Sequence, residues 1–223
     1  NMGVVTVYAC NSEFDSISKE VKNGMVSPLS YLISKTILEI PIMFLFGIVA
    51  LGVSAYGISN YYAPNMMILV SIWSLSIYCW EAIAQVMSMS FKNPLLGMML
   101  FMGVWFSAFL YGGFLIPGED MIWPFKIFYY ILPLKYTIRS MIYTEFIDSR
   151  YDSCGKTKYE DEICFGKDGD EVLENMNSIY PLFSSDNTLR VDVLIIMGLT
   201  LMFKGIYFIL LLTSNKSTSL KKN

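Results

Sequence analysis

Four long apolar stretches constrain this chain more than any other feature of its sequence. They cover residues 31–58, 66–91, 95–117 and 191–213. A helix that crosses a bilayer needs about 20 mostly apolar residues, and none of these stretches holds more than two charged residues. They also lack the polar stripe at helical spacing that a helix on the surface of a soluble protein carries. The sequence therefore predicts an all-α polytopic protein with four complete transmembrane helices, integral to the plasma membrane or another cellular membrane.

The composition agrees with this class and excludes several activities. The chain is 54% hydrophobic and 16% charged, whereas soluble domains carry roughly 25% charged residues. It has no histidine, which excludes Ser-His-Asp catalysis and histidine-ligated metals in this chain. No Gly-rich phosphate loop and no cysteine pair at zinc spacing occur. The net charge of −3 argues against nucleic acid as a partner. We expect no catalytic site, no metal and no cofactor within these residues.

The distribution of lysine predicts the topology. Residues 11–30, 92–94 and 214–223 carry the lysines of the short connections, and positively charged loops face the cytoplasm. We expect a cytoplasmic connecting helix at 11–30 and a cytoplasmic tail at 214–223. Residues 1–10 are apolar but too short to span, so we interpret them as the end of a truncated span in a fragment of one transmembrane domain.

The region between the third and fourth spans is then outside the membrane. Residues 118–146 are aromatic but broken by prolines, which favours re-entrant or interfacial helices over a full span. Residues 147–190 are polar and acidic and are interpreted as an extracellular loop. Cys154 and Cys164 lie in that loop, where an oxidising compartment favours a disulfide; two free thiols are the alternative.

Charged residues inside the spans are candidate functional groups because their burial is costly. Lys35 and Glu39 are four residues apart, so we expect an ion pair along one helix. Glu81 must protonate or find a partner, either on a translocation path or on another helix. Lys204, about halfway along the last span, is one candidate for that partner.

The segment 11–27 has the pattern of an amphipathic helix. Phe14, Ile17 and Val21 are spaced to share one face, and Gly24 follows as a C-terminal stop. The same pattern is typical of a helix that floats at the membrane surface.

Four segments together resemble the membrane domain of the ABC transporter G subfamily, the White and pleiotropic-drug-resistance type. Residues 13–20 look like its connecting-helix motif, with Phe14 where the family has arginine. Residues 31–41 are similar to the start of its third span, and residues 112–117 (Gly-Gly-Phe-Leu-Ile-Pro) to the end of its fifth. Residues 123–146 resemble its re-entrant helices, with Thr144 in place of asparagine in the closing motif.

The resemblance implies the membrane half of an ATP-driven exporter of lipids, sterols or hydrophobic xenobiotics. It implies a second transporter half, in a homo- or heterodimer, and an ATP-binding domain outside these residues that holds ATP and magnesium. Family position gives roles to three groups of residues: a substrate cavity (Met102, Phe106, Phe109), an exit plug (Phe114, Leu115) and a coupling helix (Glu13, Ile17, Lys19, Glu20). The alternatives are an intramembrane acyltransferase, disfavoured by the absence of histidine, and a passive channel, disfavoured by the uncharged third span.

Overall fold

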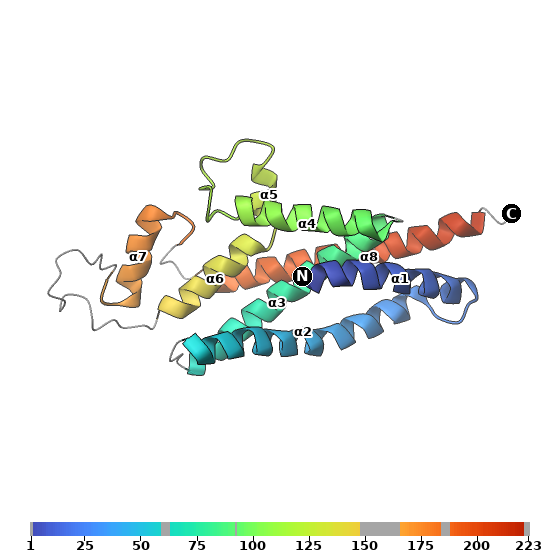
Figure 1. Ribbon diagram of the computed structural model, residues 1–223, viewed down its shortest axis with the longest axis horizontal. Helices are drawn as coiled ribbons and strands as arrows, with labels where there is room; N and C mark the ends of the chain where they lie inside the picture. Colours follow the sequence, from blue (N-terminus) through green and yellow to red (C-terminus); the bar gives the residue numbers. More distant parts are fainter. Residues whose placement is uncertain (1, 59–62, 92, 148–165, 184–187, 221–223) are drawn as a thin grey trace. The chain divides into compact units, whose positions relative to one another are not determined.

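The computed structural model describes residues 2–58, 63–91, 93–147, 166–183 and 188–220, and all regular elements in these ranges are helices (Figure 1). The helices are α1 (Met2–Lys22), α2 (Pro28–Ile58), α3 (Ala63–Ser90), α4 (Pro94–Tyr111), α5 (Lys126–Ile131), α6 (Leu134–Phe146), α7 (Gly169–Ile179) and α8 (Leu189–Leu220).

Four of these helices are long and apolar enough to cross a membrane, which confirms the predicted fold class. The spans are Pro28–Val53 of α2, Asn65–Ser90 of α3, Pro94–Tyr111 of α4 and Leu189–Thr213 of α8. Large apolar side chains on them face outward, and Leu38 and Val53 are 64% and 72% exposed. Exposed apolar surface on this scale would be unfavourable in water, so the surrounding lipid must cover it. The chain is a multi-pass integral membrane protein.

The chain divides into two compact units. The first unit comprises residues 1–46, 74–106 and 197–223. Its apolar core joins Val7 of α1, Ile83 and Ala84 of α3, and Phe101 of α4. Asn11 adds two hydrogen bonds between α1 and the end of α3. Its side-chain amide donates to the carbonyls of Ser88 (3.1 Å) and of Phe91 (3.2 Å). Helix α1 therefore packs against α3 and α4 in the first unit.

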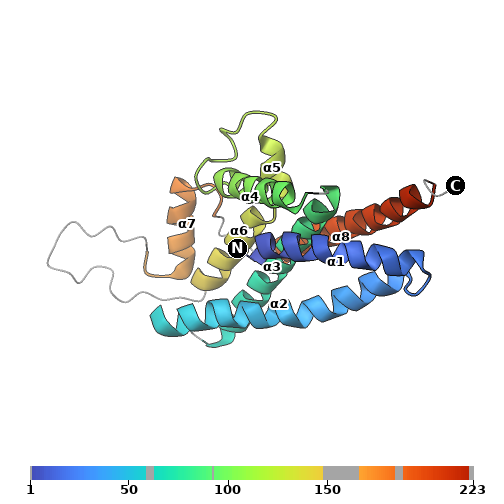
Figure 2. The ribbon, with the colours of Figure 1, turned by 45° about the vertical axis from the view of Figure 1, so that its right-hand side comes forward.

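Helix α1 runs without a break from Met2 to Lys22, so it crosses the boundary expected at residue 10. It lies beside the first half of α2 in both ribbon views (Figures 1 and 2). Phe14, Ile17 and Val21 are half-buried, whereas Lys19 and Glu20 are exposed. The predicted apolar face of this segment is thus the face that packs.

A Schellman motif ends α1, as the Asn23-Gly24 pair predicts. The N–H of Met25 donates to the carbonyl of Glu20, and the N–H of Gly24 donates to that of Val21, both at 3.1 Å. Gly24 has φ of 73°, a left-handed conformation that costs glycine little. The chain can therefore reverse within a few residues and begin α2 at Pro28.

The second unit comprises residues 47–73 and 107–196. The double glycine after α4 ends that helix, and Gly113 has φ of 87°. Residues 118–146 contain two helices, α5 and α6, separated at Pro133. Residues 147–190 are more than the loop expected from sequence, because α7 lies within them and packs on α6. The apolar pair Val172 and Leu173 is buried in α7, which explains why this short segment is helical.

We predict that Gly24→Ala destabilises the protein by about 1 kcal/mol, because alanine pays a steric cost in the left-handed conformation. No other atom lies near the added methyl group, so the effect is one of backbone conformation alone. The midpoint of thermal unfolding, followed by circular dichroism in detergent, should fall by about 2–4 °C. Gly205→Ala is the matched control, since it also meets open space but lies within α8 at ordinary dihedral angles. An unchanged midpoint for Gly24→Ala would contradict the assigned end of α1.

Candidate functional site

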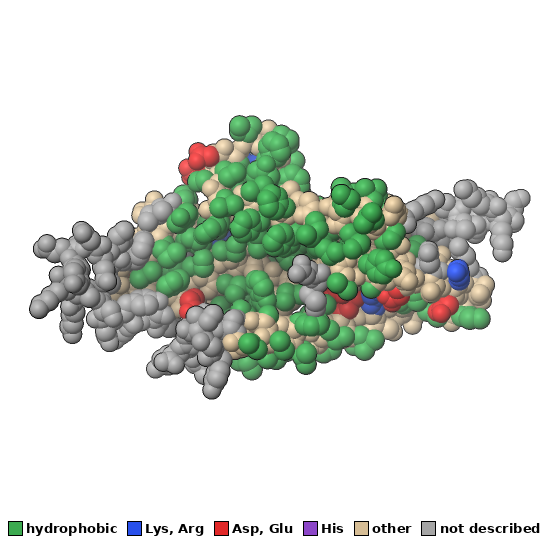
Figure 3. All heavy atoms as spheres, viewed as in Figure 1, with side chains coloured by type: hydrophobic (Ala, Val, Ile, Leu, Met, Phe, Trp, Pro, Cys, Tyr) green, Lys and Arg blue, Asp and Glu red, His purple; other side chains and the backbone are tan. Residues whose placement is uncertain are grey.

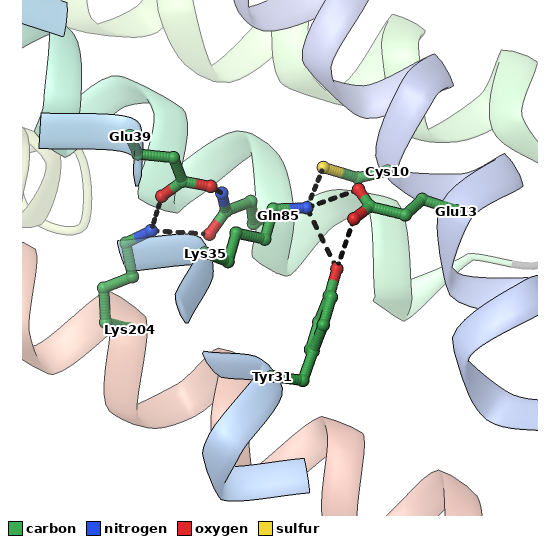
Figure 4. Close-up of polar contacts among 7 residues, drawn as sticks. All are labelled: Cys10, Glu13, Tyr31, Lys35, Glu39, Gln85 and Lys204. Carbon is green, nitrogen blue, oxygen red and sulfur yellow. Dashed lines mark hydrogen bonds and ion pairs between the residues drawn. The ribbon is translucent and has the colours of Figure 1, made fainter. Parts of the chain in front are cut away.

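A buried polar triad joins three membrane-spanning helices of the first unit (Figure 4). Glu39 of α2 accepts a hydrogen bond from the Gln85 amide of α3 at 2.6 Å and forms an ion pair with Lys204 of α8. The Lys204 ammonium also donates to Gln85 Oε1 at 2.9 Å. All three residues are less than 9% exposed. Each polar group of the triad therefore pairs with another member of the triad.

Burial gives this triad its structural importance. An isolated charge in an apolar interior costs many kcal/mol unless it is paired and hydrogen-bonded. Glu39 and Lys204 cancel each other's charge, and Gln85 bridges both with one donor and one acceptor. The three helices are thereby fixed in register, since a shift of one of them would leave a buried charge unpaired.

A second polar cluster connects α1 to the start of α2. Glu13 accepts from the Lys35 ammonium at 2.6 Å and from the Tyr31 hydroxyl at 2.8 Å. Lys35 also donates to Cys10 Sγ at 3.4 Å and to the Tyr31 oxygen at 3.2 Å. Figure 3 shows charged side chains gathered between α1 and the first half of α2. This cluster is the polar link between the amphipathic helix and the first span.

The ion pair predicted between Lys35 and Glu39 is wrong. Lys35 binds Glu13, and Glu39 binds Lys204. A contact within one helix gains only a few tenths of a kcal/mol. Partners on neighbouring helices also remove these charges from the apolar medium, so tertiary packing decides the pairing.

The environment of Glu13 favours its ionised form. Burial on one side tends to raise the pKa of the carboxyl, but the hydrogen bonds from Lys35 and Tyr31 outweigh it and hold the pKa below the ordinary value of 4.5. Glu13 is thus a carboxylate at neutral pH, and Lys35 is its counter-ion.

Glu81 of α3 remains without the partner proposed for it. Lys204 binds Glu39 and Gln85 instead. The Oε2 atom of Glu81 is buried and accepts no hydrogen bond from any residue that the structure describes. Among the described residues, no three histidine, cysteine, aspartate or glutamate side chains are grouped to hold a metal ion.

The remaining candidate residues are not members of these clusters. Met102, Phe106 and Phe109 are exposed on α4. Phe114 and Leu115 follow the Gly113 turn and are exposed, and the Phe114 ring stacks on Tyr180 at 5.6 Å. Cys154 and Cys164 lie outside the described residues, and their disulfide stays a prediction.

Neither the role of Gln85 nor the pairing of Arg139 with Asp192 was expected from the sequence. Gln85 is uncharged, yet it lies one helical turn after Glu81 and could have been noted as a second polar group in an apolar span. In the second unit, Arg139 of α6 pairs with the fully buried Asp192 of α8, and Arg139 Nε donates to Asp192 Oδ2 at 2.7 Å. Asp192 lies in the first turn of α8, where the helix dipole stabilises a carboxylate. Arg139 and Asp192 are opposite charges in two apolar segments, and this feature of the sequence could have predicted their pairing.

The fold and its paired intramembrane charges define an all-helical, multi-pass membrane protein. A sequence profile described as "ABC-2 type transporter" matches residues 1–146. The chain belongs to this family, and it is the membrane part of an ABC-type transporter, which acts with a nucleotide-binding domain. No curated protein matches the chain in a sequence comparison.

We predict that Lys204→Met destabilises the protein by about 3–5 kcal/mol, because it leaves Glu39 buried without a counter-ion. Adding Glu39→Gln to this variant should recover most of the loss, since the neutral amide introduced at position 39 can pair with the amide of Gln85. Unfolding is measured by titrating sodium dodecyl sulfate into maltoside micelles. Lys167→Met, at an exposed site, is the control and should unfold like wild type. Equal stability of Lys204→Met and wild type would refute the assigned role of the triad.

We predict that the contribution of Glu13 to stability depends on pH. Because folding lowers its pKa, the contribution is complete above pH 4.5 and is lost as pH falls below that value. The difference in melting temperature between wild type and Glu13→Gln should therefore be largest near pH 6 and shrink toward pH 3. Since Glu13 is partly exposed, the whole effect is about 1 kcal/mol or less. A difference that stays constant over this range would show that the carboxylate is not ionised in the link.

Proposed function

We propose that this chain is the membrane-spanning half of an ATP-driven exporter of the G subfamily type, which moves lipids, sterols or hydrophobic xenobiotics. The observation that carries the proposal is the polar link between α1 and α2. Glu13 binds Lys35 and Tyr31, so a displacement of α1 reaches the first span through charged contacts. An exporter driven by a separate nucleotide-binding domain needs such a connection.

The local structure of α1 fits the coupling role. The Schellman motif at Gly24 fixes how the chain leaves α1 and enters α2. Lys19 and Glu20 stay exposed near the end of α1, on a surface that a nucleotide-binding domain can contact. Ile17 is half-buried and holds the opposite face against the membrane domain. In this proposal, closure of the nucleotide-binding domains displaces α1, and the Glu13 link transmits the movement.

The exposed side chains of α4 support hydrophobic cargo. Met102, Phe106 and Phe109 present apolar surface, and apolar walls with few directed polar groups accept varied hydrophobic ligands. In the proposal a second transporter half completes the cavity. Phe114 and Leu115, placed after the Gly113 turn, form a plug that closes the outer exit by excluding water.

We predict that Glu20→Lys uncouples ATP hydrolysis from transport. Losing a charge-assisted contact of about 1.5–3 kcal/mol should lower the flux per ATP hydrolysed by about tenfold or more, while the spans stay folded. The transporter is reconstituted in liposomes with its nucleotide-binding domain, and export of a short-chain fluorescent phospholipid and of rhodamine is measured beside phosphate release.

Glu174→Lys is the matched control, because Glu174 is also exposed on a helix but lies on α7. It should behave like wild type. Normal flux at a normal ATPase rate in Glu20→Lys would refute the coupling role. Helix α1 would then be only a helix at the membrane surface. ATP hydrolysis by the wild type without flux of either probe would instead contradict the proposed class of cargo.

A further inference from the structure

A cavity of about 480 Å³ lies in the first unit, among α1, α2 and α3. Its volume is within the range of about 300–1,000 Å³ that is typical of ligand sites. Val5, Leu38 and Ile42 give it an apolar wall, and the carboxylates of Glu13, Glu39 and Glu81 border it. The cavity therefore combines a surface for hydrocarbon with several acidic groups.

The charges around the cavity do not balance. Lys35 neutralises Glu13, and Lys204 neutralises Glu39. Within the described part of the chain, Glu81 has neither an ion pair nor a hydrogen-bond donor at its buried Oε2 atom. A buried acceptor without a donor is unfavourable. A ligand with an N–H group would satisfy this oxygen, and a positive charge on that ligand would favour the ionised form of Glu81.

Other ligand classes fit the cavity less well. No cluster suited to a metal ion exists among the described residues, so a bare divalent cation lacks its ligands. An anion would meet three carboxylates, while the nearby Lys35 is already occupied by Glu13, Tyr31 and Cys10. A neutral alcohol could donate to Glu81 but would not stabilise its ionised form, as an ammonium group would.

We propose that this cavity binds an amphiphile with a primary ammonium head group. The ammonium donates to Glu81 as its counter-ion, and the alkyl chain lies along Val5, Leu38 and Ile42. Such binding requires only the first unit and does not depend on the exporter proposal, because a ligand can occupy the cavity whether or not it is moved across the membrane.

Binding of isotope-labelled dodecylamine to the purified transporter in neutral maltoside micelles tests the proposal. Glu81→Gln keeps the shape of the side chain but removes the charge, so binding should weaken about tenfold or more, as expected for a charge-assisted hydrogen bond. Glu174→Gln, on α7, should bind like wild type. Because all samples contain equal detergent, partitioning into micelles cancels in the comparison.

Two further measurements separate the site from nonspecific effects. Ser34 lines the same cavity, and Ser34→Phe should fill it and abolish binding without altering a charge, which keeps the test valid if Glu81→Gln fails to fold. Dodecanol, which lacks the ammonium, should bind wild type about tenfold more weakly than dodecylamine. Wild-type affinity in a folded Glu81→Gln or Ser34→Phe, or equal affinity for the alcohol and the amine, would overturn the proposal.

Discussion

The cost of holding a charge in an apolar medium governs this membrane domain. Glu39 and Lys204 are 165 residues apart in sequence and lie on different spans. The burial of each charge is energetically possible only because the opposite charge lies beside it. Gln85 completes the arrangement by donating to one and accepting from the other. Apolar helices slide past one another at little cost, since lipid and leucine are equally apolar. The buried triad removes that freedom and gives the first unit a defined helix register.

The same constraint explains why the link between α1 and α2 is a different kind of contact. Glu13 is partly exposed, so its interaction with Lys35 is screened and contributes little to stability. A weak contact such as Glu13–Lys35 can break and re-form during a conformational change. The buried triad is costly to break and therefore holds its helices together. The two clusters meet at neighbouring positions of α2, because Lys35 and Glu39 are one turn apart. In the proposed mechanism, a movement of α1 therefore reaches α2 one turn before Glu39.

The second unit also contains a buried charge that is paired with an opposite charge. Asp192 is fully buried at the start of α8 and is held by Arg139 of α6. Both the helix dipole and the guanidinium favour its charge. The turn at Gly113 ends α4 before the aromatic helix α5. Each unit thus contains a buried ion pair that joins two of its helices.

The sequence alone determined the four spans, the amphipathic face of α1 and its end at Gly24. These features depend on span length, on local periodicity or on a single backbone conformation, all of which are readable along the chain. The sequence also marked Glu39, Glu81 and Lys204 as costly charges. It did not predict the helix α7, whose formation depends on packing against α6.

The pairing of the charges depends on how the helices pack. Sequence spacing favoured a local pair of Lys35 with Glu39, yet both residues bind partners on other helices. Spacing also could not show that Gln85 joins the triad or that Glu81 is left facing a cavity. The physical reason is that electrostatic attraction is non-directional, so the partner of a buried charge is the group that helix packing brings within a few ångströms.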